Sequence, residues 1–232
     1  MEACATCPVR ESAICHTLPA DQLEELGRLG RQHAVRKGQT LQWEGEESLL
    51  VGNVIDGVVK LSASTWRGRD QTLGIAYPGD FIGRPFGAKS QESVTALTDA
   101  HVCTFTRGSF DEFARRHPDL EHGLLQRTLL DLEQARSWIL LLGAKTASER
   151  VAAFVLETAC RLVEHVPDDA DEPISFTLPF TRQEIADVLG LTIETVSRQI
   201  TELRCKRVID TSKGRLITIL DRAALETCAA SQ

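Results

Sequence analysis

The chain has 232 residues, 42% of them hydrophobic, which is enough for one or two ordinary cores, so we expect one large and one small domain. No stretch approaches the roughly 18 uninterrupted apolar residues that cross a membrane, and the N-terminal residues lack the apolar run of a secretion signal. We therefore expect a cytoplasmic protein with no membrane partner. The net charge of −7 argues weakly against nucleic-acid binding, because affinity for a duplex depends largely on Lys and Arg.

The first functional lead is the cysteine content of the N-terminal segment. The chain has 7 cysteines, and in a reducing cytoplasm thiols serve metal binding or redox chemistry more often than structural disulfides. Cys4, Cys7 and Cys15 fall within twelve residues of one another, where we expect no packing role. Pro8 keeps this segment from continuing as a helix. Sites built from cysteines suit zinc and iron-sulfur clusters alike, so both stay open at this point.

Residues 35–106 show short β-type runs separated by turn signals. In one run, Val59, Leu61 and Ala63 alternate with polar residues, as expected of a half-buried strand. Several short strands at this spacing predict a β-barrel or jelly roll. Cys103 lies in such a run, where a small buried hydrophobic residue would also serve. The turn signals are Asp56-Gly57, Arg67-Gly68 and Pro78-Gly79-Asp80.

A long helical pattern follows, over about residues 120–142. Its apolar residues recur at the heptad spacing of a coiled-coil seam, although the same stripe also fits a helix that packs on its own β domain. A second helix is predicted over about residues 148–163, and the acidic, proline-bracketed segment 166–173 is predicted to be a loop. The expected seam consists of Leu125, Leu132, Ala135, Ile139 and Leu142.

The most specific pattern in the chain covers residues 181–200. Thr181 with Glu184 predicts a capping box at the start of a helix. Gly190 can adopt the left-handed conformation that ends this helix, and Thr192 can cap the next one. Two short helices that meet at a tight turn predict a helix-turn-helix.

Three polar residues near the start of the second helix are candidates for reading DNA. Glu194, Ser197 and Arg198 stand at i, i+3 and i+4, which places them on one outward face. A carboxylate can accept from cytosine N4, and a guanidinium can bind guanine O6 and N7.

A basic hairpin, or wing, is predicted after the second helix. Residues 208–211 and 216–219 read as strands around a turn in which Lys213 is placed to contact phosphates. Residues 192–217 hold six basic and three acidic residues, in contrast to the acidic chain as a whole. A helical hairpin with ordinary surface charges would explain neither this reversal of charge nor the wing.

This order of parts resembles the Crp/Fnr family of bacterial transcription regulators over nearly the whole chain. The resemblance implies an α+β fold: an N-terminal β-roll (a jelly roll like that of cyclic-nucleotide-binding domains), a long dimerisation helix and a C-terminal winged helix-turn-helix. The implied boundaries are 1–19 for a cysteine-rich segment, 20–117 for the roll, 118–145 for the helix and 146–232 for the DNA-binding domain. The motifs that carry the resemblance are Pro78-Gly79-Asp80-Phe81-Ile82-Gly83, Ile139-Leu140-Leu141-Leu142, Ser148-Glu149-Arg150-Val151-Ala152-Ala153-Phe154 and Glu194-Thr195-Val196-Ser197-Arg198.

The resemblance also bears on the effector. In this family the roll often binds a cyclic nucleotide through a Gly-Glu segment and a following Arg-Ser or Arg-Thr. Residues 83–87 lack the glutamate, and no such Arg pair follows at the right distance, so we expect no cyclic nucleotide. The spacing Cys-x2-Cys-x7-Cys instead resembles a variant of the Fnr branch, which implies a [4Fe-4S] cofactor. The implied ligands are Cys4, Cys7, Cys15 and Cys103, while Cys160, Cys205 and Cys228 are structural or incidental.

The implied function is oxygen-responsive regulation of transcription. Without oxygen, the cluster favours a homodimer that binds a palindromic TTGAT-N4-ATCAA-like site in double-stranded DNA and acts with RNA polymerase. Two alternatives stay open: a regulator of the same architecture with another input, such as a small ligand, zinc or thiol redox, and an iron-sulfur electron-transfer protein. The second leaves the reading helix and the wing unexplained. The 6 histidines are scattered and form no nucleophile-base pair, so we expect no enzyme.

Overall fold

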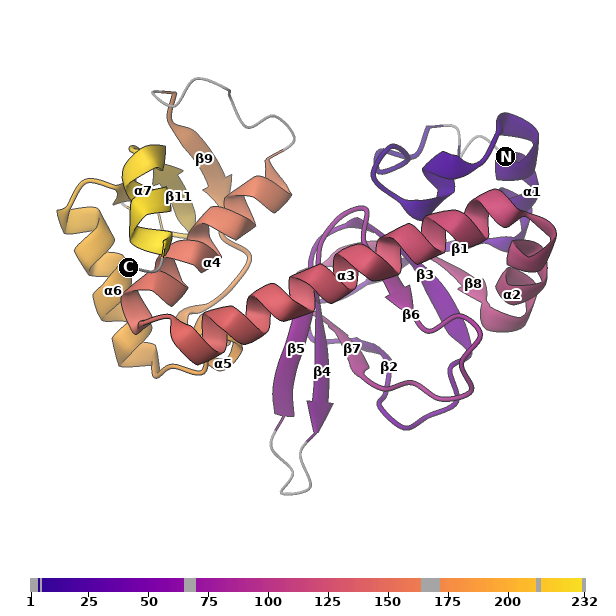
Figure 1. Cartoon of the computed structure of the whole chain (residues 1–232), viewed down its shortest axis with the longest axis horizontal. Coiled ribbons are helices and arrows are strands. Elements are labelled where there is room, and N and C mark those ends of the chain that lie inside the picture. The colour runs from indigo at the N-terminus through magenta and orange to yellow at the C-terminus, as the bar shows by residue number, and fades with distance from the viewer. Residues whose placement is uncertain (1–3, 5, 65–69, 164–171, 212–213, 231–232) are drawn as a thin grey trace. The chain divides into compact units, whose positions relative to one another are not determined.

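The chain forms two compact units, residues 1–135 and residues 136–232, and the division falls inside one long helix, α3 (Pro118–Ala144) (Figure 1). The computed structural model describes residues 4, 6–64, 70–163, 172–211 and 214–230. Within that part of the chain, no helix combines the length and the apolar character needed to span a bilayer.

The first unit contains the expected β-roll, which is built from two antiparallel four-stranded sheets. The strand orders are β1-β8-β3-β6 and β2-β7-β4-β5. Both sheets contribute buried residues to one core, among them Val54 and Val102 from the first and Val59 and Val94 from the second. The strands are β1 (Arg31–Val35), β2 (Thr40–Gln42), β3 (Leu50–Asp56), β4 (Val59–Ser64), β5 (Asp70–Ala76), β6 (Phe81–Gly83), β7 (Ser93–Ala96) and β8 (Ala100–Thr106).

One detail of the strand prediction is wrong. The alternation in β4 places Ser62 outside, but Ser62 is buried and Ala63 is only half-buried. The pairing of β4 with β5 shifts register between Leu61 and Ser62, which is a bulge. The extra residue of the bulge is Leu73 on β5, and β4 itself pairs with β7 without a shift, so the burial of Ser62 is a local departure from the alternation that the bulge does not explain. The predicted Arg67-Gly68 turn lies outside the described residues.

Helices cover the other face of the first sheet. Val51 and Phe105 point to this face, because they alternate with Val54 and Val102, which point into the roll. The covering elements are the 3₁₀ helix η1 (Ile14–Thr17), α1 (Ala20–Leu29), α2 (Arg107–Arg116) and the start of α3. We call their shared interior the helix-side core; its buried residues are Ile14, Leu18, Leu23, Leu26, Val51, Phe105, Phe110, Phe113, Ala114, Leu120 and Leu124.

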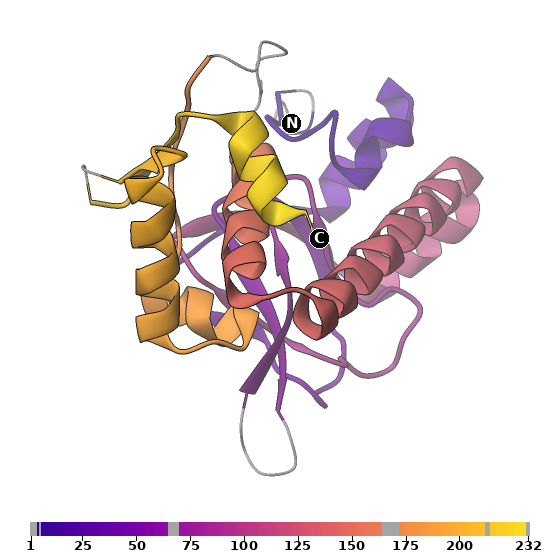
Figure 2. The ribbon, with the colours of Figure 1, turned by 60° about the vertical axis from the view of Figure 1, so that its left-hand side comes forward.

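The second unit is a small domain of helices and a three-stranded sheet in the order β10-β11-β9 (Figure 2). Its first helix, α4, matches the predicted helix closely, and Thr146 with Glu149 closes a capping box at its start. Phe154 and Phe180 meet edge to face in the core, with ring centroids 5.0 Å apart. Most of the expected acidic loop lies outside the described residues. The elements are α4 (Ala147–Leu162), β9 (Ile174–Thr177), α5 (Arg182–Leu189), α6 (Ile193–Cys205), β10 (Ile209–Asp210), β11 (Leu216–Ile219) and α7 (Arg222–Ala229).

Candidate cysteine site and nucleic-acid interface

Three cysteines, Cys4, Cys15 and Cys103, pack against the helix-covered face of the first sheet. Cys103 lies in β8, an inner strand between β1 and β3. It packs against the helix-side core together with Cys4 and Cys15 from the N-terminal segment. Gly27 on α1 leaves space for the side chain of Cys4, because a Cβ at Gly27 would lie 2.8 Å from the Cys4 sulfur. The fold therefore brings distant parts of the sequence to one place.

The pKa values of these thiols show that they influence one another. Burial raises the pKa of Cys103 to about 12, and the nearby thiols of Cys4, Cys7 and Cys15 raise it further. Burial also raises the pKa of Cys15 to about 11, with added contributions from Cys7 and Cys4. The metal-free site therefore favours neutral thiols.

A metal ion or a cluster requires several ligand side chains close together. In the described part of the chain, no three His, Cys, Asp or Glu side chains stand close enough together to hold a metal ion. The donor chemistry nevertheless fits a thiolate-bound group, since all four side chains are cysteines that interact electrostatically. The side chains therefore have the right chemistry for such a group, and Cys4, Cys15 and Cys103 lie in the same region of the fold. To bind the group, the thiols must move closer together and lose their protons.

The N-terminal segment is more firmly packed than the sequence suggests. We expected no packing role for residues 4–15, but Val9, Ala13 and Ile14 are buried, as is Leu18 just beyond. Single apolar residues between cysteines carry no periodic pattern, so this burial could not be read from the sequence.

The N-terminal segment contacts the start of α3. Thr17 lies against Gly123, where an added Cβ would come within 3.0 Å of the Thr17 methyl group. Ile14 and Leu18 share the helix-side core with Leu120 and Leu124 of α3. A glycine on α3 thus permits close approach of the segment that carries the cysteines.

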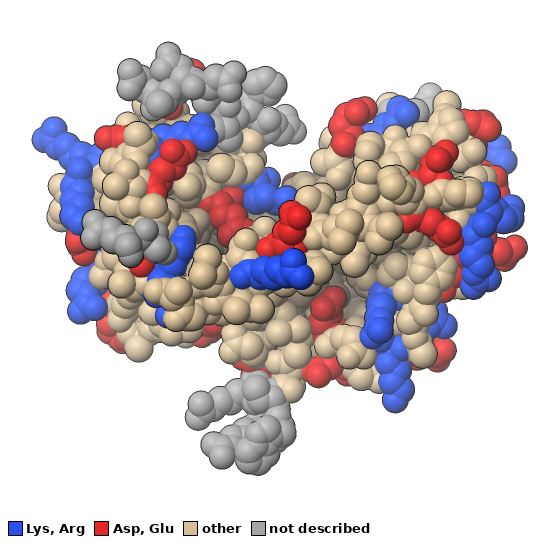
Figure 3. All heavy atoms as spheres, viewed as in Figure 1, with Lys and Arg blue, Asp and Glu red and all other residues tan. Residues whose placement is uncertain are grey.

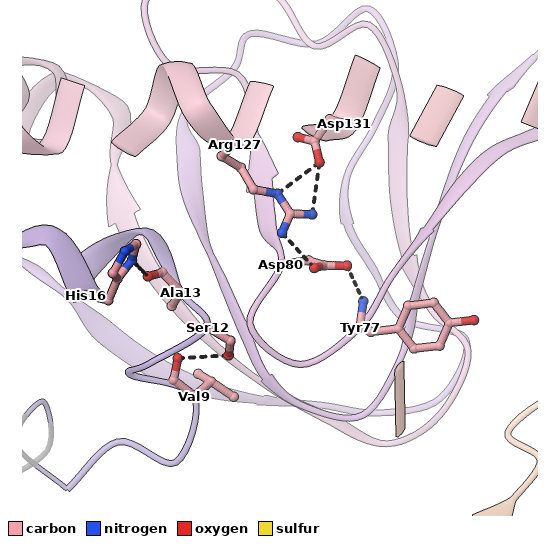
Figure 4. A network of polar contacts seen from close by, with 8 residues as sticks. All are labelled: Val9, Ser12, Ala13, His16, Tyr77, Asp80, Arg127 and Asp131. Atoms are coloured by element: carbon pink, nitrogen blue, oxygen red, sulfur yellow. Dashed lines mark hydrogen bonds and ion pairs between the residues drawn. The ribbon is translucent and has the colours of Figure 1, made fainter. Parts of the chain in front are cut away.

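A polar network, which could not be predicted from the sequence, also connects α3 to the roll (Figure 4). Arg127 on α3 forms an ion pair of 2.9 Å with Asp80, which is buried, and a second pair of 2.9 Å with Asp131 one turn away. Asp80 also accepts a hydrogen bond from the backbone N–H of Tyr77. Ser12 lies against Gly79, which leaves no room for a Cβ there. The turn that holds Arg127 therefore contacts the N-terminal segment.

The second unit contains the predicted helix-turn-helix. Thr181 and Glu184 form the expected capping box on α5, Gly190 is left-handed with φ of 62°, and Thr192 caps α6. Ala186 is fully buried and its carbonyl accepts from the N–H of Leu191, which closes the turn. These local features fix the relative placement of the two helices.

Arg150 supports this motif from α4. Its Nη1 donates to the carbonyl of Leu189 at 3.1 Å, and its Nε donates to the carbonyl of Lys145 at 2.9 Å. Leu189 is the last residue of α5, where carbonyl groups lack partners within the helix. Arg150 lies in the Ser148–Phe154 motif that carries the family resemblance, but its sequence position alone does not predict this role.

The three candidate reading residues are all exposed on α6, which lies at the outer edge of its unit in Figures 1 and 2. Hydrogen bonds from its own backbone and from Thr192 lower the pKa of Glu194. Its carboxylate is therefore ionised at neutral pH and can only accept. Ser197 and Arg198 follow along the same face, as the spacing predicted.

The wing is described in part. β10 pairs with β11, and the turn between them includes Gly214, left-handed with φ of 72°, and the exposed Arg215. Lys213, the candidate phosphate contact, lies outside the described residues.

Large apolar side chains are exposed along α3. Leu125, Leu132 and Ile139 are 56%, 46% and 72% exposed, Ala135 is also exposed and Leu142 is half-buried. Figure 3 shows that uncharged residues make up most of the visible surface along α3. Because Leu125, Leu132 and Ile139 are exposed, they do not pack on the β domain of their own chain. Leu120 and Leu124, at the start of α3, pack there instead.

A small cavity lies inside the roll. Its volume is about 20 Å³ and its lining is almost wholly apolar, with Leu41, Val51, Ile82 and Val94 among the residues. About one water molecule needs that much space.

Comparisons with known proteins agree with this architecture. Two family models match: the cyclic nucleotide-binding domain over residues 32–117 and the Crp-like helix-turn-helix domain over residues 149–228. The transcriptional activator protein FnrL of Cereibacter sphaeroides is 37% identical over 225 residues, which cover 97% of this chain and 91% of that protein. The nitrogen fixation regulation protein FixK of Bradyrhizobium diazoefficiens is 37% identical over 228 residues, 98% of this chain and 94% of that protein. The structure of FixK2 from Bradyrhizobium japonicum has a TM-score of 0.78 and 32% identity, covering 88% of this chain and 98% of that chain.

With homologues over nearly its full length and both characteristic domains present, the chain belongs to the Crp/Fnr family of DNA-binding transcription regulators.

Proposed function

We propose that this regulator responds to oxygen through a [4Fe-4S] cluster held by Cys4, Cys7, Cys15 and Cys103. The observation that carries the proposal is that Cys4 and Cys15 pack with Cys103 against the helix-side core, and that Cys103 lies on an inner strand of the first sheet. When bound, the cluster supplies an oxygen-sensitive group, which is the chemistry that a sensor needs. In this proposal, residues 1–19 form the sensing segment and residues 20–117 the roll that supports it.

The protein's own residues connect the cysteines to α3. The N-terminal segment contacts Gly123 through Thr17, and it contacts the turn of Asp80 through Ser12. Asp80 holds Arg127 of α3. A change in the position of the segment therefore acts on α3 through both packing and charge, over contiguous contacts.

Residues 118–145 then act as the dimerisation helix, with the seam Leu125, Leu132, Ala135, Ile139 and Leu142. Exposed leucine and isoleucine side chains on a helix are stabilised by burial against a second copy. A two-fold dimer presents two reading helices to half-sites about 34 Å apart. The DNA-binding domain, residues 146–232, reads a TTGAT-N4-ATCAA-like palindrome through Glu194, Ser197 and Arg198, with Lys213 on a phosphate.

Activation together with RNA polymerase is part of the proposal. It is supported by the name of FnrL, a transcriptional activator protein that matches nearly the whole chain.

The test is iron and sulfide analysis of the full chain after anaerobic purification. We expect about four irons and four sulfides per chain and a visible absorbance band. Serine in place of Cys4, Cys7, Cys15 or Cys103 should abolish the band. Serine in place of Cys160 or Cys205 is the matched control, since both thiols are exposed and lie in the other unit.

Two results would contradict the proposal. A cluster that survives Cys103→Ser would show that this thiol is not a ligand. A colourless protein that contains zinc would assign the cysteines to another input on the same architecture.

A further inference from the structure

Asn53 lies directly opposite Cys103 in the first sheet. The register of β3 and β8 pairs Asn53 with Cys103, and the register of β3 and β6 pairs Asn53 with Phe81. Residues directly opposite on antiparallel strands point to the same face. Val51 and Phe105, two residues further along, lie in the helix-side core, so Asn53 faces the same side as the cysteine site.

The side chain of Asn53 is polar in an apolar place. Only 4% of the residue is exposed, and among the described residues its Oδ1 has no hydrogen-bond partner. A buried amide without a partner lowers the stability of the fold, so it calls for an explanation. Half a turn about the Cβ–Cγ bond exchanges the oxygen with the N–H₂ group, so the amide can also donate.

We propose that Asn53 is a positioning residue for the iron-sulfur cluster, and that its amide donates a hydrogen bond to Cys103 Sγ or to a cluster sulfide. This inference rests on the proposed function. Hydrogen bonds to the sulfurs raise the reduction potential of a cluster, because they stabilise the more negative reduced state. Asn53 therefore makes the cluster harder to oxidise and prolongs its life in air.

The test compares Asn53→Leu with Asn53→Thr in the full chain. Leucine has a similar size and no donor, whereas threonine keeps a hydroxyl donor and suits a strand. Thr104→Val is the matched control: Thr104 is the next residue in β8, it is also buried, and it lines the cavity on the roll side of the sheet.

Three measurements are made: the midpoint potential of the loaded protein, the decay of its visible absorbance in air, and the melting temperature of the cluster-free protein. For Asn53→Leu we expect a lower potential and a decay roughly tenfold faster, in line with the loss of other groups that support metal ligands. We expect the cluster-free Asn53→Leu protein to melt at a higher temperature, because a buried amide oxygen without a partner is removed. Asn53→Thr should restore the potential in part, and Thr104→Val should leave it unchanged.

The outcomes separate this inference from the proposed function. If the wild-type chain loads a cluster and Asn53→Leu has the same potential and decay, the role of Asn53 is overturned while the cluster stands. A fall in the melting temperature of cluster-free Asn53→Leu with no change in potential would show a structural role only. A wild-type chain that takes up no iron overturns both.

Discussion

At the scale of single residues, the buried thiols make the metal-free protein sensitive to alkaline pH. The pKa values of Cys15 and Cys103 rise from an ordinary 9.0 to about 11 and about 12 on folding. Because the folded state holds these protons more tightly, the stabilisation is complete below about pH 9 and is lost as pH rises towards 12. We expect the free energy of unfolding to fall over that window, and to fall less steeply in Cys103→Ala. Denaturant titrations at pH 8 to 11 check this, with Cys160→Ala as the control.

A second residue-scale prediction separates the reading of bases from the binding of phosphates. Arg198→Ala should lose about 1–3 kcal/mol of discrimination at one guanine, because a bidentate contact to a base edge is removed. Lys213→Ala should weaken binding to all sequences and reduce its salt dependence. Binding to the palindrome and to single-base variants at several salt concentrations distinguishes the two. If both substitutions weaken every site equally, Arg198 does not read a base.

At the scale of elements, the pair of Asp80 and Arg127 links the roll to α3. Arg127→Gln removes an ion pair whose members are 6% and 20% exposed, and should destabilise the protein by about 1.5–3 kcal/mol. The cysteines are untouched, so cluster content should stay as in the wild type. We expect the difference in DNA affinity between loaded and air-exposed protein to shrink, because the ion-pair contact to α3 is lost while the packing contacts remain.

The control for this prediction is Arg115→Gln, since Arg115 is exposed at the end of α2. An Arg127→Gln protein that keeps the full oxygen response would show that the signal passes through Thr17 and Gly123 alone.

The seam on α3 gives the second prediction for an element. Each leucine or isoleucine that becomes fully buried contributes roughly 1.5–3 kcal/mol, whereas association costs an estimated 4–15 kcal/mol. The free energy of dimerisation from the seam alone is therefore close to zero, and ordering of the N-terminal segment can decide between monomer and dimer. Ile139→Glu should abolish dimerisation and DNA binding with the cluster intact, and Ala135→Asp should sharpen the oxygen response.

Sedimentation of loaded and air-exposed protein at matched concentration measures both effects. Equal dimer constants for the two forms of the wild type would mean that the cluster acts by some route other than this helix.

At the scale of the whole molecule, the sequence predicted best what is decided locally. The helix-turn-helix could be predicted residue by residue, because the capping box of Thr181 and the left-handed Gly190 depend on near neighbours. Helical spacing alone predicted that the candidate reading residues Glu194, Ser197 and Arg198 are exposed on α6. The cysteine set came from a family resemblance, and the structure adds that the four thiols influence one another.

Contacts between distant segments could not be predicted. The bulge at Leu73 in β5, the pairing of Asn53 with Cys103 and the ion pair of Asp80 with Arg127 depend on strand register and on which helix covers which face. Neither the strand register nor the placement of the helices can be read from a single sequence. The short helices α1 and α2 were missed, because each is a polar segment of ten residues whose apolar side chains form no long repeat.

The way in which the N-terminal segment is anchored has a consequence for its dynamics. Its described backbone hydrogen bonds close only local turns, such as Ala13 N–H to the carbonyl of Val9 and Leu18 N–H to the carbonyl of Cys15. Side chains alone, chiefly Ile14 and Leu18, hold it to the rest of the unit. It can therefore detach by local opening without breaking a single sheet hydrogen bond. In hydrogen-deuterium exchange, its amides should exchange far sooner than those of β3 and β8 in metal-free protein, and binding of the cluster should slow them selectively.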